Sequence, residues 1–157
     1  MIPALSLVLV LAASFGEMAY GLTEEEKTTI LAKHNQYRNE VDPPAANMRS
    51  LRWNHWLANT AQTWADQCTF SDNNPSSPRW DVVGQNIAQG VGSSLISLMD
   101  SWNNQKDKYD LDTDTCSPAR ASCNQYIQVV WATTSFLGCG KAQCEGKTYL
   151  VCYYGTG

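Results

Sequence analysis

Six cysteines, all between positions 68 and 152 of a 157-residue chain, constrain the fold of this protein more than any other feature. An even number of cysteines behind an apolar N-terminal run is typical of a secreted domain held together by disulfides. Many pairings are possible in principle. The sequence around the cysteines narrows the choice.

A predicted hairpin defines the first pair. If Glu145 and Gly146 form its tip, Cys139 and Cys152 face each other directly across two antiparallel strands, at a Cα spacing that a disulfide accepts. Cys144 differs from Cys139 in parity, so its side chain leaves the opposite face of the sheet.

The remaining pairs follow from this first one. Cys116 and Cys123 flank a short loop that contains Ser-Pro and can close locally. Cys68 is then left for Cys144, and the chain-entropy model gives such a long-range link about 4 kcal/mol of stabilisation.

The N-terminus has the pattern of a secretory signal. Residues 4–13 are apolar but too few to span a bilayer. We expect a signal peptide over residues 1–21, cleaved after Gly21 or alternatively after Gly16, and one secreted, extracellular domain over residues 22–157. The sequence has no second apolar run long enough to predict a membrane span. The net charge of −4 gives no electrostatic reason to bind nucleic acid.

The hydrophobic pattern predicts a mixture of helices and strands. In chain order they are a helix from a Thr23–Glu26 capping box to about Glu40, an extended segment 51–54, a helix capped by Asn54, a strand 82–88, a helix capped by Ser93 or Ser94, and a hairpin of 136–144 with 148–154. Residues 126–134 are ambiguous, because their β-branched side chains favour a strand.

Three segments resemble, in order, the signatures of one protein family. They are 84–87 (GQNI), 123–140 (CNQYIQVVWATTSFLGCG) and 150–155 (LVCYYG). Together with the cysteines they are similar to the CAP superfamily, which comprises the cysteine-rich secretory proteins, venom antigens and plant pathogenesis-related proteins. The resemblance covers one SCP-like domain.

This resemblance implies an α+β fold, a three-layer α-β-α sandwich with a small antiparallel sheet and three disulfides. It implies a short helix within 126–134, although the β-branched residues of this segment favour a strand. The plant branch of the family implies the same disulfide connectivity as the spacing does.

Many relatives carry a central cavity with two histidines and two glutamates that sometimes holds zinc. The corresponding positions here are Asp72, Gln85, Gln105 and Gln125. Zinc prefers thiolate, imidazole and carboxylate ligands, and a glutamine cannot act as a general acid or base near neutral pH. We therefore predict a degenerate cavity with no catalytic residue, no metal and no cofactor. The glutamines are expected to form a hydrogen-bond network.

A second potential metal site also fails on its pattern. Asp110-X-Asp112-X-Asp114 resembles the start of a calcium-binding loop, but Thr115 replaces the required glycine and Ala121 replaces the bidentate glutamate. A solvated acidic turn is the better interpretation.

Three further side chains are candidates for a functional role. His34 has no second ligand at metal-binding spacing, so we interpret it as a structural histidine of the first helix. Trp56 lies off the apolar stripe of its helix, and Trp80 lies in a polar loop. Both are candidates for exposed ligand contacts, although coverage of Trp56 by a loop is the simpler interpretation.

The sequence supports three functional hypotheses. The first is a secreted, non-catalytic binding protein for a sterol, a fatty acid or an extracellular protein. The second is a secreted hydrolase, which the missing imidazoles disfavour. The third is a defence or signalling ligand that acts through its surface.

Overall fold

The computed structural model describes residues 21–157, so the predicted signal peptide lies outside the described residues except for Gly21. The helices are α1 (Glu24–Asn39), α2 (His55–Ala65), α3 (Leu95–Asn103) and α4 (Asn124–Val129), with 3₁₀ turns η1 (Asn104–Lys108) and η2 (Arg120–Ser122). The strands are β1 (Arg52–Trp53), β2 (Gly84–Val91), β3 (Tyr109–Asp110), β4 (Thr115–Cys116), β5 (Thr134–Cys144) and β6 (Lys147–Thr156). Among the described helices, none is both long and apolar enough to cross a bilayer.

The central sheet has the strand order β1-β5-β6-β2, and β3 and β4 form a separate two-stranded ribbon. β2 and β5 both run antiparallel to β6, as predicted. The two-residue β1 is parallel to β5, with Arg52 opposite Phe136, so the sheet is antiparallel except at this short edge. β1 is the point where the chain passes along the sheet edge between α1 and α2, and it runs in the direction of β5 as it does so.

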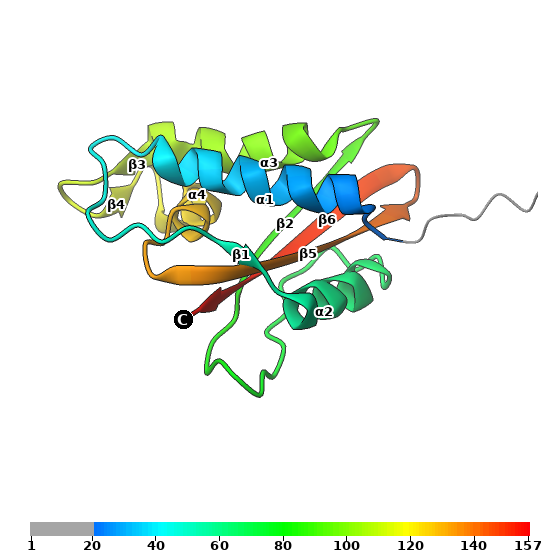
Figure 1. Cartoon of the computed structure of the whole chain (residues 1–157). Coiled ribbons are helices and arrows are strands. Elements are labelled where there is room, and N and C mark those ends of the chain that lie inside the picture. The colour runs from blue at the N-terminus through cyan, green and yellow to red at the C-terminus, as the bar shows by residue number, and fades with distance from the viewer. Residues whose placement is uncertain (1–20) are drawn as a thin grey trace, which may run out of the picture.

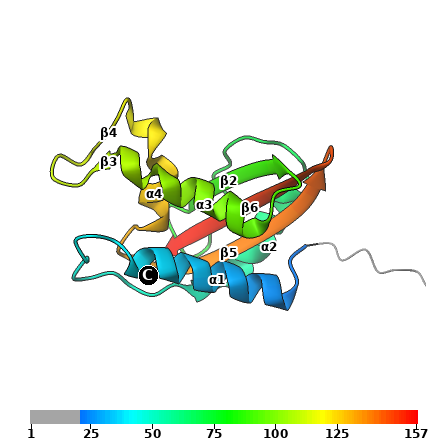
Figure 2. The same ribbon diagram turned by 90° about the horizontal axis from the view of Figure 1, so that it is seen from above.

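The sheet separates two helical layers, which confirms the α-β-α sandwich (Figure 1). Helices α1, α3 and α4 cover one face and α2 covers the other, and Figure 2 shows α1 and α3 side by side above the strands. Alternate residues of β6 enter the two layers. Leu150 and Cys152 pack with α1 and α3, and Val151 and Tyr153 pack with α2.

Two glycines of β5 let α2 lie directly on the sheet. A Cβ atom at Gly138 would lie 2.2 Å from the backbone nitrogen of Ala58, and one at Gly140 would lie 2.4 Å from Cα of Gln62. Both distances are far below van der Waals contact, so any side chain at these positions would push the helix away.

Side-chain caps fix the starts of the helices where the sequence predicts them. Thr23 and Glu26 form the capping box of α1, Asn54 caps α2, and Ser94 caps α3. The ambiguous segment 126–134 contributes to the helix α4, as the family resemblance implied.

The three disulfides join the predicted cysteines. Cys139 bonds to Cys152 across β5 and β6, and Cys116 bonds to Cys123. The third disulfide joins Cys68, just beyond α2, to Cys144 at the end of β5.

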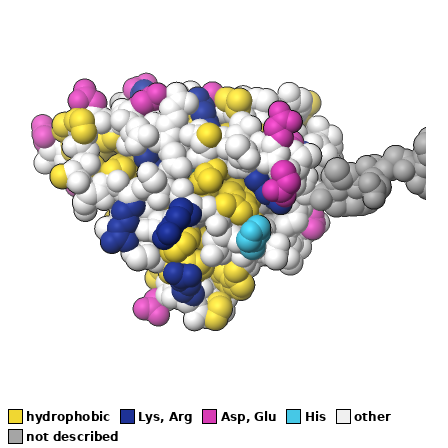
Figure 3. Space-filling view, in the orientation of Figure 1, with side chains coloured by type: hydrophobic (Ala, Val, Ile, Leu, Met, Phe, Trp, Pro, Cys, Tyr) yellow, Lys and Arg dark blue, Asp and Glu magenta, His cyan; other side chains and the backbone are white. Residues whose placement is uncertain are grey.

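Charge is unevenly distributed over the surface. On the face shown in Figure 3, Lys and Arg side chains gather next to hydrophobic ones in the area where β1 and the start of α2 lie in Figure 1.

Candidate functional site

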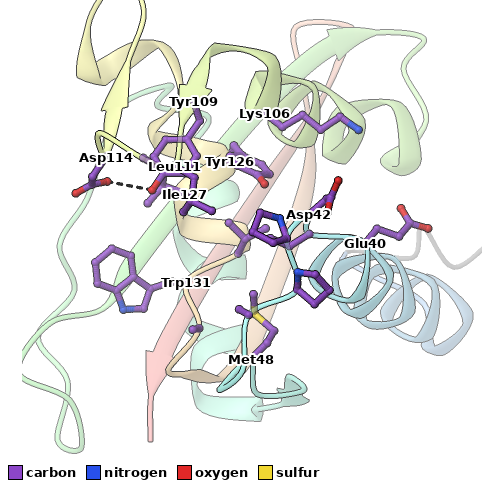
Figure 4. Close-up of a pocket in the computed structure, with 16 residues that line it drawn as sticks. Glu40, Asp42, Met48, Lys106, Tyr109, Leu111, Asp114, Tyr126, Ile127 and Trp131 are labelled. Atoms are coloured by element: carbon purple, nitrogen blue, oxygen red, sulfur yellow. Dashed lines mark hydrogen bonds between the residues drawn. The ribbon is translucent and has the colours of Figure 1, made fainter.

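A hollow of about 590 Å³ opens between three segments that are distant in sequence (Figure 4). We call it the apolar groove. One wall is the segment 40–48 after α1, the second is formed by residues of 106–114, and the third is 126–132 at α4. Most of its lining is aliphatic, aromatic or proline.

Two large apolar side chains of the groove remain uncovered. Leu111 and Trp131 are each 51% exposed. The rings of Tyr109 and Tyr126 lie 6.0 Å apart at the second and third walls. Apolar surface that the chain itself does not cover is a common property of ligand sites.

Charged side chains at the groove are mainly acidic. Glu40, Asp42 and Asp114 contribute three carboxylates, and Lys106 contributes a single ammonium group. Hydrogen bonds from Arg120 and Tyr109 lower the pKa of Asp114, which therefore stays ionised at neutral pH.

The buried guanidinium of Arg38 joins two walls of the apolar groove. It donates hydrogen bonds to the carbonyl oxygen of Arg49 and to those of four residues within 129–134. Burial lowers the pKa of Arg38 to about 10, so the group is still charged at neutral pH. Arg38 thus fixes the segment after α1 against the segment after α4.

A second hollow, of about 640 Å³, lies between β2, the loop 66–83 and α4. We call it the amide cleft, because Asn and Gln side chains make up much of its lining. Of the four positions predicted to form the degenerate cavity, Asp72, Gln85 and Gln125 line this cleft. Gln105 is not part of the lining.

The three glutamines do not form a single network. Gln85 donates to the hydroxyl of Tyr153 over 3.2 Å, and its Oε1 accepts from the backbone nitrogen of Asn73 over 2.9 Å. Gln105 Nε2 instead donates to Gln125 Oε1 over 2.7 Å. Gln105 therefore lies behind Gln125 and supports it.

Gln125 connects the amide cleft to a buried chain of hydrogen bonds. Its Nε2 donates to the carbonyl of Ile87, and its own carbonyl accepts from Asn86 Nδ2 over 2.9 Å. Asn86 Nδ2 also donates to the hydroxyl of Tyr154, which lies 2.9 Å from Nε2 of His34. Sequence reasoning identified His34 as structural but missed this connection, because its members are 120 positions apart in sequence.

The side chains of the amide cleft do not fit a zinc ion. The amides of Gln85 and Gln125 are engaged by the protein through both their oxygen and their nitrogen atoms. Asp72 is exposed, and within residues 21–157 no group of three or more His, Cys, Asp or Glu side chains is placed to hold a metal. Zinc would need imidazole, thiolate or carboxylate groups here.

The loop that carries Trp80 covers part of Trp56, in line with the simpler interpretation of Trp56, but Trp80 itself departs from expectation. Trp80 is only 8% exposed, so the prediction of an exposed contact was wrong for this residue. The loop 66–83 folds back and places Trp80 between the rings of Trp56 and Phe136, at centroid distances of 6.0 and 5.7 Å. Trp56 is half-buried, because Trp80 covers part of it.

The two hollows share a wall. Ile127 and Trp131 line both the apolar groove and the amide cleft. Sequence analysis did not identify the apolar groove. The one available signal was Leu111, an apolar residue within an otherwise acidic turn.

Comparison with known proteins agrees with this architecture. A sequence model of the cysteine-rich secretory protein family, CAP, matches residues 31–154. Peptidase inhibitor 16 of Homo sapiens is 37% identical over 141 residues, which cover 90% of this chain and 30% of that protein. Venom allergen 5 of Vespula vidua is 38% identical over 160 residues, with 87% of this chain and 77% of that protein covered.

Among solved structures, venom allergen-like protein 4 of Schistosoma mansoni superimposes with a TM-score of 0.76 at 29% identity, covering 87% of this chain and 90% of that one. The chain spans less than a third of peptidase inhibitor 16 but most of the two venom allergen relatives. The signatures, the disulfides and the sandwich agree with these matches, and the chain belongs to the cysteine-rich secretory protein (CAP) family.

Proposed function

We propose that this protein is an extracellular, non-catalytic binding protein that holds a small apolar molecule, a sterol or a fatty acid, in the apolar groove. The observation that carries the proposal is the pair of half-exposed side chains, Leu111 and Trp131, in a hollow of about 590 Å³. A volume of this size suits one small ligand, and burial of apolar surface would drive its binding.

The charges around the groove favour a neutral ligand. Glu40, Asp42 and Asp114 would repel a fatty-acid carboxylate, and only Lys106 would attract it. A sterol carries a hydroxyl group in place of the carboxylate. We therefore expect a sterol to bind more tightly than a fatty acid of similar apolar area.

The state of the histidine and cysteine side chains, on which many hydrolases depend, supports a non-catalytic role. His34 is fully buried, and burial lowers its pKa to about 4. The other histidine, His55, is exposed at the start of α2 and has no hydrogen-bonded nucleophile. All six cysteines are in disulfides. Among the described residues, the serine and threonine hydroxyls donate to backbone carbonyls or to other hydroxyls and not to a histidine or a carboxylate, so the activated nucleophile of a serine or threonine hydrolase is not formed.

An extracellular location is supported by chemistry and by relatedness. Three disulfides persist in oxidising compartments and are rare in the cytosol. The matching family is described as secretory, and the similar proteins include a venom allergen.

Ligand titration monitored by tryptophan fluorescence tests the proposal, because Trp131 lines the groove. We expect a sterol to change the tryptophan fluorescence saturably, and a fatty acid to bind with lower affinity than the sterol. Leu111→Glu should weaken binding at least about tenfold, since the ligand would have to bury an unpaired carboxylate. Ile96→Glu is the matched control, because Ile96 is 44% exposed on α3 outside the groove.

Two results would contradict this function. The absence of a saturable change with either ligand would reject small-molecule binding and favour docking onto an extracellular protein. Equal weakening by both glutamate variants would show that the ligand does not enter the groove.

A further inference from the structure

Outside the two hollows, two exposed arginines stack on one aromatic ring. The Cζ atoms of Arg52 and Arg79 lie 5.0 Å and 4.5 Å from the ring centroid of Phe136. Arg79 also lies 5.3 Å from the ring of Trp80. These distances are within the range of cation–π attraction. We call Arg52, Arg79 and Phe136 the arginine platform.

The guanidinium groups of the platform are not neutralised by the protein. Within residues 21–157, neither side chain has an ion-pair partner or donates a hydrogen bond. The basic side chains that do pair with carboxylates are Lys27, Lys33, Lys141 and Arg120. Two adjacent positive charges, each with five N–H donors, therefore face solvent.

The platform is held in place from below. Phe136 packs against Trp80 at 5.7 Å, and Trp80 packs against Trp56 at 6.0 Å. Arg52 is fixed in β1 directly opposite Phe136. Because stacking already restricts both guanidinium groups, less side-chain entropy would be lost when they bind a ligand.

The surroundings of the platform extend its positive charge. Arg49 is exposed and donates from Nη1 to the hydroxyl of Ser135, the neighbour of Phe136, and to the carbonyl of Gly157. Figure 3 shows Lys and Arg side chains gathered on this face next to hydrophobic ones, with a histidine close by. The positive charge is therefore local, although the chain as a whole carries a net charge of −4.

We propose that the arginine platform binds the sulfate groups of a sulfated polysaccharide. The planar fork of a guanidinium presents two parallel N–H groups to two oxygens of a tetrahedral oxyanion, and such charge-assisted bonds are about twice as strong as neutral ones. A linear polyanion can contact the basic strip alone. An anionic membrane is an extended plane, so it would also approach the acidic side chains elsewhere on the surface, and these would repel it.

A titration of the full chain with a heparin-derived octasaccharide at physiological ionic strength tests this inference. The Arg52→Gln/Arg79→Gln double variant should bind at least about tenfold more weakly than the unmodified protein. The matched control is Lys108→Gln/Lys147→Gln, which removes the same charge from outside the platform and the groove and should change affinity less than about twofold. Arg52→Lys/Arg79→Lys keeps the charge but loses the fork, and should bind at least about threefold more weakly.

Three outcomes would overturn the inference. The first is that the unmodified protein does not bind the octasaccharide. The second is that Arg52→Gln/Arg79→Gln and Lys108→Gln/Lys147→Gln lose the same amount of octasaccharide affinity. The third is that the protein binds phosphatidylserine vesicles but not the octasaccharide. Thermal melting of each variant confirms that it is folded. Binding of the sterol in the apolar groove should be unchanged in Arg52→Gln/Arg79→Gln, so failure here is distinguishable from failure of the proposed function.

Discussion

The imidazole of His34 and the hydroxyl of Tyr154 lie 2.9 Å apart, with 0% and 2% of the two residues exposed. The other ring nitrogen, Nδ1, lies 2.8 Å from the carbonyl oxygen of Ile30. A carbonyl only accepts, so Nδ1 donates to it, and Nε2 of the neutral ring accepts from Tyr154. This arrangement joins α1 to β6 and leaves no place for a second proton on the ring.

The first prediction concerns acid sensitivity. Burial, assisted by the charge of Arg38, lowers the pKa of His34 to about 4 from the ordinary histidine value of about 6.5. As the pH falls, the unfolded chain therefore takes up this proton before the folded one does. The resulting stability is fully present above about pH 6.5 and is lost as the pH falls towards about 4, a loss on the order of 3 kcal/mol.

Urea unfolding at several pH values between 7.5 and 4 measures this loss. The matched variant is His34→Gln, which cannot titrate in this range. The free energy of unfolding of the unmodified protein should fall towards that of the variant as the medium is acidified. A constant difference between the two proteins would show that His34 does not titrate in the way described.

The second prediction concerns Arg38. Arg38→Met would leave several buried carbonyl oxygens without a donor, at about 1–3 kcal/mol each. We expect the free energy of unfolding to fall by at least about 3 kcal/mol, and affinity in the apolar groove to fall as well, because two of its walls lose their connection. Arg120→Met removes an exposed arginine and should cost less than about 1 kcal/mol. Similar costs in both variants would disprove the anchoring role.

The third prediction compares two glycine-to-alanine changes. Gly138→Ala would place a methyl group 2.2 Å from the backbone of α2, which cannot move without lifting the helix. We expect the free energy of unfolding, measured by thermal denaturation, to fall by about 1–3 kcal/mol or more. Gly84→Ala meets only the end of the flexible Gln128 side chain and should be the milder change. The reverse order would contradict the close packing of α2 on β5.

The fourth prediction concerns zinc. Calorimetric titration with micromolar zinc should give no stoichiometric binding, because amides replace the usual ligands. The double change Gln85→Glu/Gln125→His introduces a carboxylate and an imidazole on the same cleft and should raise zinc affinity at least about tenfold. Tight zinc binding by the unmodified protein would refute the interpretation of this cleft.

Much of the fold was predictable because its signals are local. The capping box at Thr23 and the cap at Asn54 depend on residues within three positions of each other. Parity along a hairpin was enough to pair Cys139 with Cys152, since the turn at Glu145 fixes the register.

The errors arose where tertiary contacts decide the outcome. Trp80 lies in a polar, Pro- and Ser-rich loop, and nothing in its neighbours indicates that the loop returns to pack its ring on Phe136. The place of Gln105 behind Gln125 depends on how η1 meets α4. The apolar groove unites three distant segments, so no single stretch of sequence carries its pattern.

Ile127 and Trp131 border both hollows, so a substitution at either position changes the shape of both. A replacement that widens one hollow for a bulkier guest also removes lining from the other. When one of these two residues changes to suit the ligand of one hollow, we therefore expect a compensating change among the residues that line the other hollow.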